Sequence, residues 1–278
     1  MASEPQIRLA VFGKPVIHSL SPRIHNLFAD QCGLKVDYRA IEATPESFPV
    51  LAAELAGKGG RGCNITAPLK HDAWKLAGRS SESASRARAA NTLVFEDSTT
   101  WYADSTDGAG LVNHLRSIPG CRLHGARLCL LGAGGAAASV LGALLGTEPE
   151  SVFIANRTRD RAIELAQAHS DLGTVDTGTP EDLASQLPFD MIINATSLGH
   201  GGSAPRLSPE WLTPGGICYD MNYASAAEPL RQLCRKKGIR YSDGLGMLVG
   251  QAALSFALWT GHAPDAAEVM EILRSAES

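Results

Sequence analysis

Charged residues are scarce in this sequence, and the basic ones form no Lys- or Arg-rich block or stripe. Of its 278 residues, 25 are Lys or Arg and 29 are Asp or Glu, which gives a formal net charge of −4 at pH 7. Proteins that bind nucleic acids or anionic membranes usually carry a Lys- or Arg-rich block or stripe. We therefore expect neither a nucleic acid nor a membrane as a partner.

The sequence also has little that would direct it into or across a membrane. The opening residues, MASEPQIRLAVFG, contain no basic stretch followed by a long apolar stretch, so no secretory signal is expected. The uncharged run 128–147 has the length of a membrane span. Its five glycines and many alanines instead fit a strand followed by a helix.

Cysteine and histidine motifs are absent as well. The six cysteines form no C-x-x-C pair and lie mostly in apolar stretches, which is typical of reduced core thiols in a cytoplasmic protein. The eight histidines form no H-E-x-x-H motif or other metal-ligand spacing. We therefore expect a cytoplasmic protein without a metal.

The N-terminal part alternates predicted strands and helices. Strands are expected at 8–12 and 36–41, each followed by a helix. Both helices begin with the same signal, a cap residue before a proline, at Ser21-Pro22 and Thr44-Pro45. The first helix should end before Gly33. This β-α-β-α order predicts a parallel sheet with helices on its faces.

A glycine turn lies near the middle of the chain, in RLCLLGAGGAAASVLGALLG from 127 to 146. Gly132, Gly134 and Ala137 have the G-x-G-x-x-G/A spacing, which makes a tight turn, admits a pyrophosphate and lets the helix pack on the strand. Backbone N–H groups at the helix start would bind the phosphates. Glycine turns also serve plain strand-to-helix connections, so the spacing alone leaves both interpretations open.

The next predicted strand, 151–155, ends in basic rather than acidic residues. An NAD site usually carries an acid there, but this chain continues Asn156-Arg157-Thr158, with Arg161 close behind. Guanidinium groups suit the 2′-phosphate of NADP. The alternative is that Thr158 caps a helix whose first turn is basic. Cations there oppose the helix dipole, which favours a bound anion.

Small polar side chains recur where the N-terminal strands meet loops. Singly, each has a structural explanation: Asn91 suits a turn, and Asp107 suits the first turn of a helix. Open α/β sheets bind ligands at this edge, however. The recurrent residues are Ser19, Ser21, Thr66, Lys70, Asn91 and Asp107. Together they would suit a polyhydroxylated acid.

From end to end, the sequence resembles the shikimate dehydrogenase family. The matching segments are VFGKPVIHSLSP (11–22), NITAPLK (64–70), AANTL (89–93), STDG (105–108), GAGGAA (132–137), NRT (156–158), INATSLG (193–199), YDMNY (219–223) and DGLGMLVGQAA (243–253). The resemblance implies an open α/β substrate domain at 1–109 and a Rossmann-type NADP domain at 110–245. A C-terminal helical segment at 246–278 would return to the first domain.

The resemblance implies reversible NADPH-dependent reduction of 3-dehydroshikimate to shikimate, in chorismate and aromatic amino-acid biosynthesis. By position, Lys70 and Asp107 are the catalytic pair. A ketone that accepts hydride becomes an alkoxide, which a nearby ammonium stabilises and protonates.

The other roles also follow from the resemblance. The substrate carboxylate would bind Ser19 and Ser21, the ring hydroxyls Thr66, Asn91 and Gln251, and Tyr223 would close the pocket. The expected NADP site comprises Gly132, Ala133, Gly134, Gly135, Ala136, Asn156, Arg157, Thr158, Arg161, Thr196, Met221, Gly244 and Met247.

Two departures from the family pattern leave alternatives open. Ser105 stands where the family usually has Asn, and Asn222 occupies a usually apolar place. A quinate/shikimate dehydrogenase or a low-activity paralogue is therefore the alternative. A non-catalytic NADP-binding sensor is the alternative of another class, but a dead site has no chemical need for Lys70, Asp107 and Asn91 together. A monomer or a homodimer would be compatible with the sequence.

Overall fold

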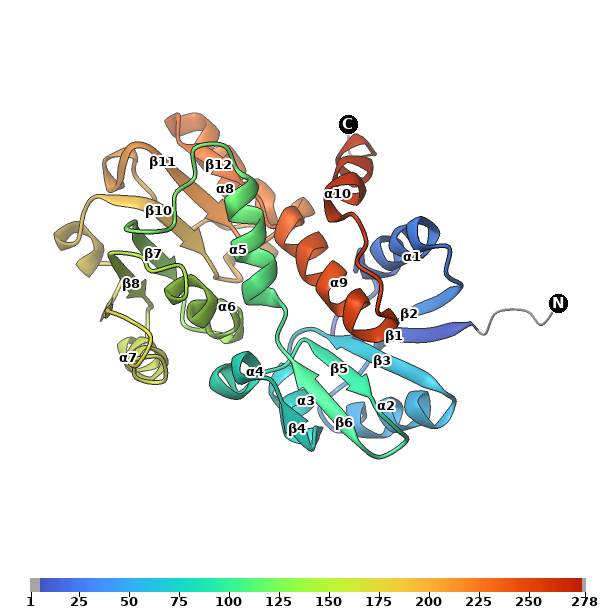
Figure 1. Cartoon of the computed structure of the whole chain (residues 1–278). Coiled ribbons are helices and arrows are strands. Elements are labelled where there is room, and N and C mark those ends of the chain that lie inside the picture. Colours follow the sequence, from blue (N-terminus) through green and yellow to red (C-terminus); the bar gives the residue numbers. More distant parts are fainter. Residues whose placement is uncertain (1–5, 277–278) are drawn as a thin grey trace. The chain divides into compact units, whose positions relative to one another are not determined.

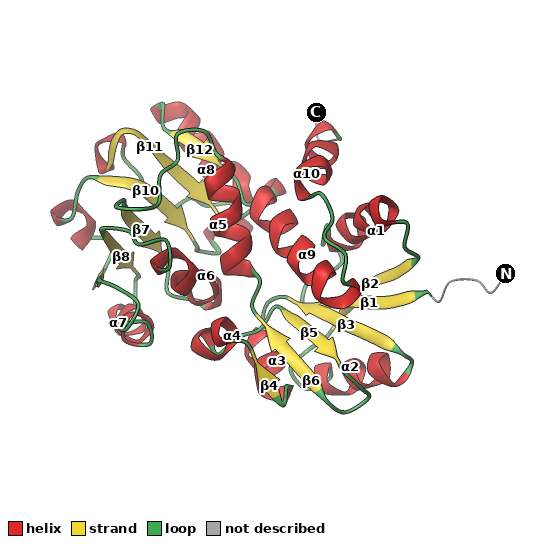
Figure 2. Cartoon of the chain, viewed as in Figure 1, coloured by secondary structure: helices red, strands yellow, loops and turns green. Residues whose placement is uncertain are grey.

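The computed structural model describes residues 6–276, which form helices and strands arranged in two α/β units (Figure 1, Figure 2). The first unit combines Met1–Gly110 with Val249–Ser278, and the second is Leu111–Leu248. The chain passes between them within α5 (Asp107–Ser117) and within α9 (Leu245–Thr260).

The first unit contains a mixed six-stranded sheet of order β2-β1-β3-β5-β6-β4. Its strands are β1 (Ile7–Gly13), β2 (Val36–Glu42), β3 (Gly60–Ile65), β4 (Arg79–Ser80), β5 (Thr92–Phe95) and β6 (Trp101–Asp104). β1 pairs in parallel with β2 and β3, as the β-α-β-α order predicts, but β5 is antiparallel to β3 and β6. The prediction of a parallel sheet is wrong for β5, because only the short connection 96–100 joins β5 to β6, and a parallel pair needs a long crossover.

Helices and cores cover both faces of this sheet. Besides α9, the helices of the first unit are α1 (Ser21–Cys32), α2 (Phe48–Gly57), α3 (Lys70–Leu76), α4 (Glu82–Ala87) and α10 (Ala266–Ser275). Alternate residues of β1 face the two cores. Ala10 and Phe12 belong to the core with residues of α2, α3 and α4, whereas Leu9 and Val11 pack in the core with Trp259 of α9.

The starts of α1 and α2 differ from the predicted starts. Ser21 is not a cap but the first residue of α1, and its N–H donates to Oγ of Ser19 at 3.2 Å. α2 begins at Phe48, because Thr44 closes a turn in which its N–H donates to Oγ of Ser47 at 2.9 Å. The predicted end of α1 is confirmed, since Gly33 is its left-handed C-cap.

The second unit contains a parallel six-stranded sheet of order β12-β11-β10-β7-β8-β9, the order of a Rossmann fold. Its strands are β7 (Arg127–Leu131), β8 (Ser151–Ala155), β9 (Val175–Gly178), β10 (Phe189–Asn194), β11 (Leu212–Asp220) and β12 (Arg240–Ser242). The strand expected before the glycine turn is β7, and the predicted strand 151–155 is confirmed as β8.

Helices cover both faces of this second sheet. α5, α6 (Gly135–Leu145) and α7 (Arg159–Gln167) contribute to one core, and α8 (Glu228–Lys237) contributes to the other. The uncharged run 128–147 is divided between β7 and α6, as its glycines indicate. Within residues 6–276, no helix is both long and apolar enough to cross a membrane.

Candidate active site

The charged groups of Lys70 and Asp107 form an ion pair in the first unit. Lys70 is the first residue of α3 and Asp107 the first of α5. Nζ lies 2.6 Å from Oδ2, and the side chains are 22% and 8% exposed. The pair is therefore partly screened from water but open on one side. An ammonium held in this way can stabilise an alkoxide and supply a proton.

Asn91 holds the other oxygen of the Asp107 carboxylate. Its Nδ2 donates to Oδ1 of Asp107 at 2.8 Å and to Oε1 of Gln251 at 2.9 Å. Its Oδ1 accepts from the backbone N–H of Thr106 at 2.9 Å. Because a backbone N–H can only donate, this bond determines which end of the Asn91 amide faces Asp107. The structure thus brings four of the predicted site residues together: Lys70, Asn91, Asp107 and Gln251.

The two predicted carboxylate-binding serines are neighbours. Oγ of Ser19 donates to Oγ of Ser21 at 3.1 Å, and Ser21 is buried at the start of α1. Ser21 also faces Tyr38 of β2. Burial raises the pKa of Tyr38 well above its ordinary value, and a hydrogen bond with Ser21 opposes this rise. The paired hydroxyls form a compact polar group suited to an anion.

Thr66 occupies a position that depends on Gly13. A Cβ on Gly13 would lie only 2.2 Å from Cγ2 of Thr66, so no larger residue fits without displacing the threonine. The N–H of Thr66 donates to the carbonyl of Phe12 at 2.9 Å, which ties it to the end of β1. Gly13 was missed as a site residue, although its place in the matching segment VFGKP was a usable signal.

The glycine turn after β7 has the geometry that a dinucleotide needs. Gly132 has a φ of +105°, which favours glycine, and a Cβ there would lie 3.2 Å from the carbonyl oxygen of Ala195. The Cβ positions of Gly134 and Gly135 meet no described atom within 4 Å. Ala137 is fully buried in the core. The start of α6 is therefore open to a phosphate, and these residues fit NADP.

Asn156 connects this turn to the basic segment after β8. Its Oδ1 accepts from the N–H of Ala133 at 3.2 Å, and its Nδ2 donates to the carbonyl of Thr158 at 2.8 Å. Arg157 and Arg161 are exposed. Thr158 precedes α7, but its side chain accepts no hydrogen bond from the described amides of that helix. The capping explanation for Thr158 therefore lacks its hydrogen bond.

Three of the four remaining predicted NADP residues, Thr196, Met221 and Gly244, lie around the segment that follows β11. The carbonyl of Thr196 accepts from Nδ2 of Asn222 at 3.1 Å, and the N–H of Gly244 donates to the carbonyl of Asn222 at 2.9 Å. A Cβ on Gly244 would lie 2.3 Å from the carbonyl oxygen of Met221, so glycine is required there. Met247, by contrast, packs into the core of the unit.

A hydrogen bond to Asp220 explains why a polar residue stands at position 222. Asp220 is fully buried, and its Oδ1 accepts from Nδ2 of Asn194 at 2.9 Å and from Nδ2 of Asn222 at 2.8 Å. Burial raises the pKa of Asp220 and these hydrogen bonds oppose the rise. Asn194 and Asp220 were missed as candidates. Both are polar residues that end a buried strand, which was the available signal.

Two further residues that the sequence singled out are Tyr223 and Ser105. Tyr223 belongs to the second unit, where burial raises the pKa of its hydroxyl, and its place beside the substrate stays a prediction. Ser105 is buried, and its Oγ has no partner among the described residues. Ser105 directly precedes Thr106 and Asp107 in the chain.

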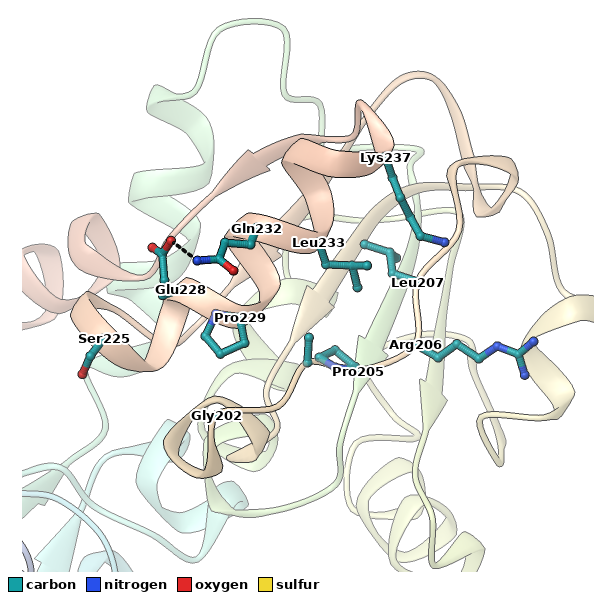
Figure 3. Close-up of a pocket in the computed structure, with 11 residues that line it drawn as sticks. Gly202, Pro205, Arg206, Leu207, Ser225, Glu228, Pro229, Gln232, Leu233 and Lys237 are labelled. Carbon is teal, nitrogen blue, oxygen red and sulfur yellow. Dashed lines mark hydrogen bonds between the residues drawn. The ribbon is translucent and has the colours of Figure 1, made fainter.

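A separate open cavity of about 630 Å³ lies beside α8 in the second unit (Figure 3). Pro205, Leu207 and Leu233 give it an apolar wall, and the hydrogen-bonded pair Glu228 and Gln232 lies on the helix. None of the residues predicted for the substrate or for NADP lines this cavity.

Comparison with known families gives matches along most of the chain. The shikimate dehydrogenase substrate binding domain matches residues 11–93, shikimate / quinate 5-dehydrogenase matches 115–201, and the shikimate 5′-dehydrogenase C-terminal domain matches 244–274. The first two matches cover the segments that contain Lys70 and the glycine turn.

Similar proteins include enzymes named shikimate dehydrogenase (NADP(+)). The one from Dechloromonas aromatica (strain RCB) is 44% identical over 95% of this chain and 96% of its own length. The one from Chromohalobacter salexigens is 47% identical over 96% and 97%. A crystal structure of shikimate 5-dehydrogenase from Thermus thermophilus with NADP(H) and shikimate has a TM-score of 0.82 and 33% identity, and covers 97% of this chain and 99% of that chain. Given relatives this similar over nearly its whole length, the chain belongs to the shikimate dehydrogenase family.

Proposed function

We propose that this protein is an NADP-dependent shikimate dehydrogenase that reversibly reduces 3-dehydroshikimate to shikimate, in the biosynthesis of chorismate and the aromatic amino acids. The observation that carries the proposal is the ion pair of Lys70 and Asp107, with Nζ 2.6 Å from Oδ2. Asn91 holds the same carboxylate. Family membership and the geometry of the glycine turn support the same reaction.

In the reductive direction, NADPH held by the glycine turn and the basic segment after β8 would supply a hydride for the carbonyl carbon. Lys70 stabilises the negative charge that develops on the carbonyl oxygen and donates a proton to it from Nζ. Asp107 holds the ammonium in place, and Asn91 keeps the carboxylate turned toward Lys70. In the oxidative direction, Lys70 takes the hydroxyl proton back.

The substrate carboxylate is proposed to bind the paired hydroxyls of Ser19 and Ser21. Their 3.1 Å separation lets both serve one anion. The ring hydroxyls are assigned to Thr66, Asn91 and Gln251, of which the last two already share a hydrogen bond of 2.9 Å. We assign Tyr223 to the closing side of the pocket on the strength of the resemblance alone.

NADP is proposed to bind the second unit through the glycine turn and the basic segment after β8. The open start of α6 suits the pyrophosphate, and the exposed guanidinium groups of Arg157 and Arg161 suit the 2′-phosphate. Asn156 joins the two parts through its hydrogen bonds to Ala133 and Thr158. We assign Thr196, Met221, Gly244 and Met247 to the NADP site on the strength of the resemblance.

Quinate is a second candidate substrate, and Ser105 favours it. The family usually has a larger asparagine at this position, and the buried Oγ of Ser105 has no described partner. This departure from the family pattern directly before Thr106 and Asp107 is the reason for keeping quinate as a candidate. A non-catalytic sensor is disfavoured, because the Lys70 and Asp107 groups are assembled in bonding geometry.

Steady-state oxidation of shikimate and quinate, each with NADP and with NAD, tests both candidates. We expect turnover of shikimate with a preference for NADP. A higher kcat/KM for quinate would reassign the substrate. Binding of NADP without turnover of either acid would establish the sensor instead.

We also propose that the protein works in the cytoplasm as a monomer or a homodimer. In the described structure all six cysteines are free thiols, and Cys63, Cys129, Cys218 and Cys234 are buried. Such thiols suit a reducing compartment. Sedimentation of the purified chain with a reductant would measure its oligomeric state.

A further inference from the structure

Asn64, near the end of β3, is a buried residue outside the set expected to touch the substrate. Its side chain joins groups from several elements of the first unit. Oδ1 accepts from the hydroxyl of Tyr38 at 2.7 Å and from Nε2 of His25 at 3.1 Å. Nδ2 donates to the backbone carbonyl of Asn91 at 3.1 Å and to Oγ of Ser255 at 3.0 Å. One carboxamide therefore connects α1 and β2 with the residue that precedes β5 and with α9.

The direction of these hydrogen bonds is determined by the Asn91 carbonyl. A carbonyl oxygen can only accept, so a flipped Asn64 amide would place two acceptors 3.1 Å apart. Oδ1 must then face Tyr38 and His25, and both must donate to it. His25 is neutral, because burial lowers its pKa to about 3. Its Nδ1 has no partner among the described residues, which agrees with a proton on Nε2.

The bond to Asn91 is connected to the catalytic pair through one residue, Asn91 itself. Asn64 holds the main chain of Asn91, whose side chain donates to Asp107. A second route passes through hydroxyl groups, since Nδ2 of Asn64 also donates to Oγ1 of Thr92 at 3.2 Å, and Thr92 donates to Oδ1 of Asn91 at 3.1 Å. Both routes act on the orientation of the amide that keeps the Asp107 carboxylate turned toward Lys70.

We propose that Asn64 is a positioning residue for the dehydrogenase reaction, which acts by holding Asn91 in the orientation that aligns Asp107 with Lys70. On the opposite side, the same carboxamide is bonded to Tyr38, which faces the Ser21 hydroxyl. Asn64 thus links the two ends of the proposed substrate site. The assignment rests on the proposed function, because the alignment matters only if Lys70 and Asp107 act on a substrate.

The variant Asn64→Asp tests the direction of these bonds. A protonated carboxyl keeps one acceptor and one donor, whereas an ionised one sets a negative oxygen against the Asn91 carbonyl. Burial raises the pKa of the introduced carboxyl, so this group should stay protonated at low pH. As pH rises it should lose its proton, and Asn91 should then lose its alignment. The titratable groups around it are His25, Tyr38 and Cys63, and Lys70 and Asp107 lie beyond Asn91.

The measurement is kcat for shikimate oxidation from pH 6 to 9, expressed as the ratio of variant to wild type. We expect a ratio within about twofold of one at the acid end and a fall of roughly tenfold at the alkaline end, because a hydrogen bond is replaced by repulsion. The matched control is Asn26→Asp on the exposed side of α1, whose ratio should stay constant. A constant ratio in the Asn64 variant overturns the proposal.

If the Asn64 variant does not fold, the variant Tyr38→Phe tests the positioning role of Asn64 instead. It removes the 2.7 Å bond to Oδ1 and leaves the core packing nearly unchanged. We expect kcat to fall about two- to tenfold, with KM for NADP unchanged. A wild-type kcat in a folded Tyr38→Phe protein overturns the assignment. An inactive wild type overturns the proposed function itself, and the positioning role with it.

Discussion

Lys70 and Asp107 each begin a different helix, yet Nζ of the lysine lies 2.6 Å from Oδ2 of the aspartate. The positive end of a helix dipole disfavours a cation such as Lys70 at the first position of α3 and favours an anion such as Asp107 at the first position of α5. The carboxylate therefore offsets an unfavourable place for the ammonium. This arrangement keeps a proton donor where a substrate can reach it.

Replacing Lys70 with alanine should lower kcat for shikimate by about 10² or more, because the alkoxide loses its stabilising charge and its proton donor. NADP binding should stay intact, since the glycine turn belongs to the other unit. Steady-state kinetics and NADP titration measure both. The matched control is Lys75→Ala, an exposed lysine of the same helix. Equal kcat values for wild type and Lys70→Ala would remove Lys70 from the mechanism.

Replacing Arg157 with alanine should weaken NADP binding tenfold or more and NAD binding little, because a charge-assisted hydrogen bond contributes about 1.5 to 3 kcal/mol. Parallel titrations with the two cofactors make the comparison. Arg235→Ala, on the exposed surface of α8, is the control. An equal loss for NADP and NAD would show that Arg157 does not bind the 2′-phosphate.

Ser19→Ala should raise KM for shikimate while kcat is retained, because a bond to the substrate carboxylate is lost in ground state and transition state alike. The structure adds an effect on stability. Oγ of Ser19 accepts from the first N–H of α1 at 3.2 Å, so the variant should also lose about 1 kcal/mol, as for a lost cap. Kinetics and thermal unfolding of the same sample separate the two effects.

Ser21→Ala supplies the comparison for that experiment. Since Ser21 is not the cap of α1, its removal should raise KM without the loss of a capping bond. A wild-type KM in both variants would reduce the segment HSLSP to a structural turn.

The free energy of unfolding should depend on pH through His25. Burial lowers its pKa to about 3, against about 6.5 when unfolded. Between these values the unfolded chain binds a proton that the folded chain does not, so stability falls as pH falls through this window. Chemical denaturation at pH 4 to 7 should show that the free energy of unfolding depends less steeply on pH in His25→Gln than in the wild type. Exposed His200→Gln is the control, and identical slopes for all three proteins would contradict the assignment.

Much of the second unit was predictable because its signals are local. The bounds of β8 agree with the predicted strand 151–155, and β7 is the strand expected before the glycine turn, since each is a short apolar run that ends at a turn residue. Gly132 adopts the positive φ that its motif requires. The first unit was less predictable, because the sequence does not reveal that the 96–100 connection folds β5 back on β6.

The site was predictable only in part, for a different reason. The resemblance named Lys70, Asn91 and Asp107, and the structure joins them by hydrogen bonds. The resemblance gave no such role to Asn64 or Asp220, which touch other protein groups rather than a ligand in our assignment. Their importance lies in partners far along the chain, such as Ser255 for Asn64.

By itself, the sequence determined the class of the protein, the places of several strands and of the glycine turn, and the end of α1, because those depend on neighbouring residues. Only the tertiary structure decided which polar groups pair and in which direction each hydrogen bond points. Asn91 and Gln251 are 160 positions apart, yet their side chains lie 2.9 Å from each other. Such pairs depend on sheet order and on how α9 packs, and a buried donor must then take whichever acceptor the fold places beside it.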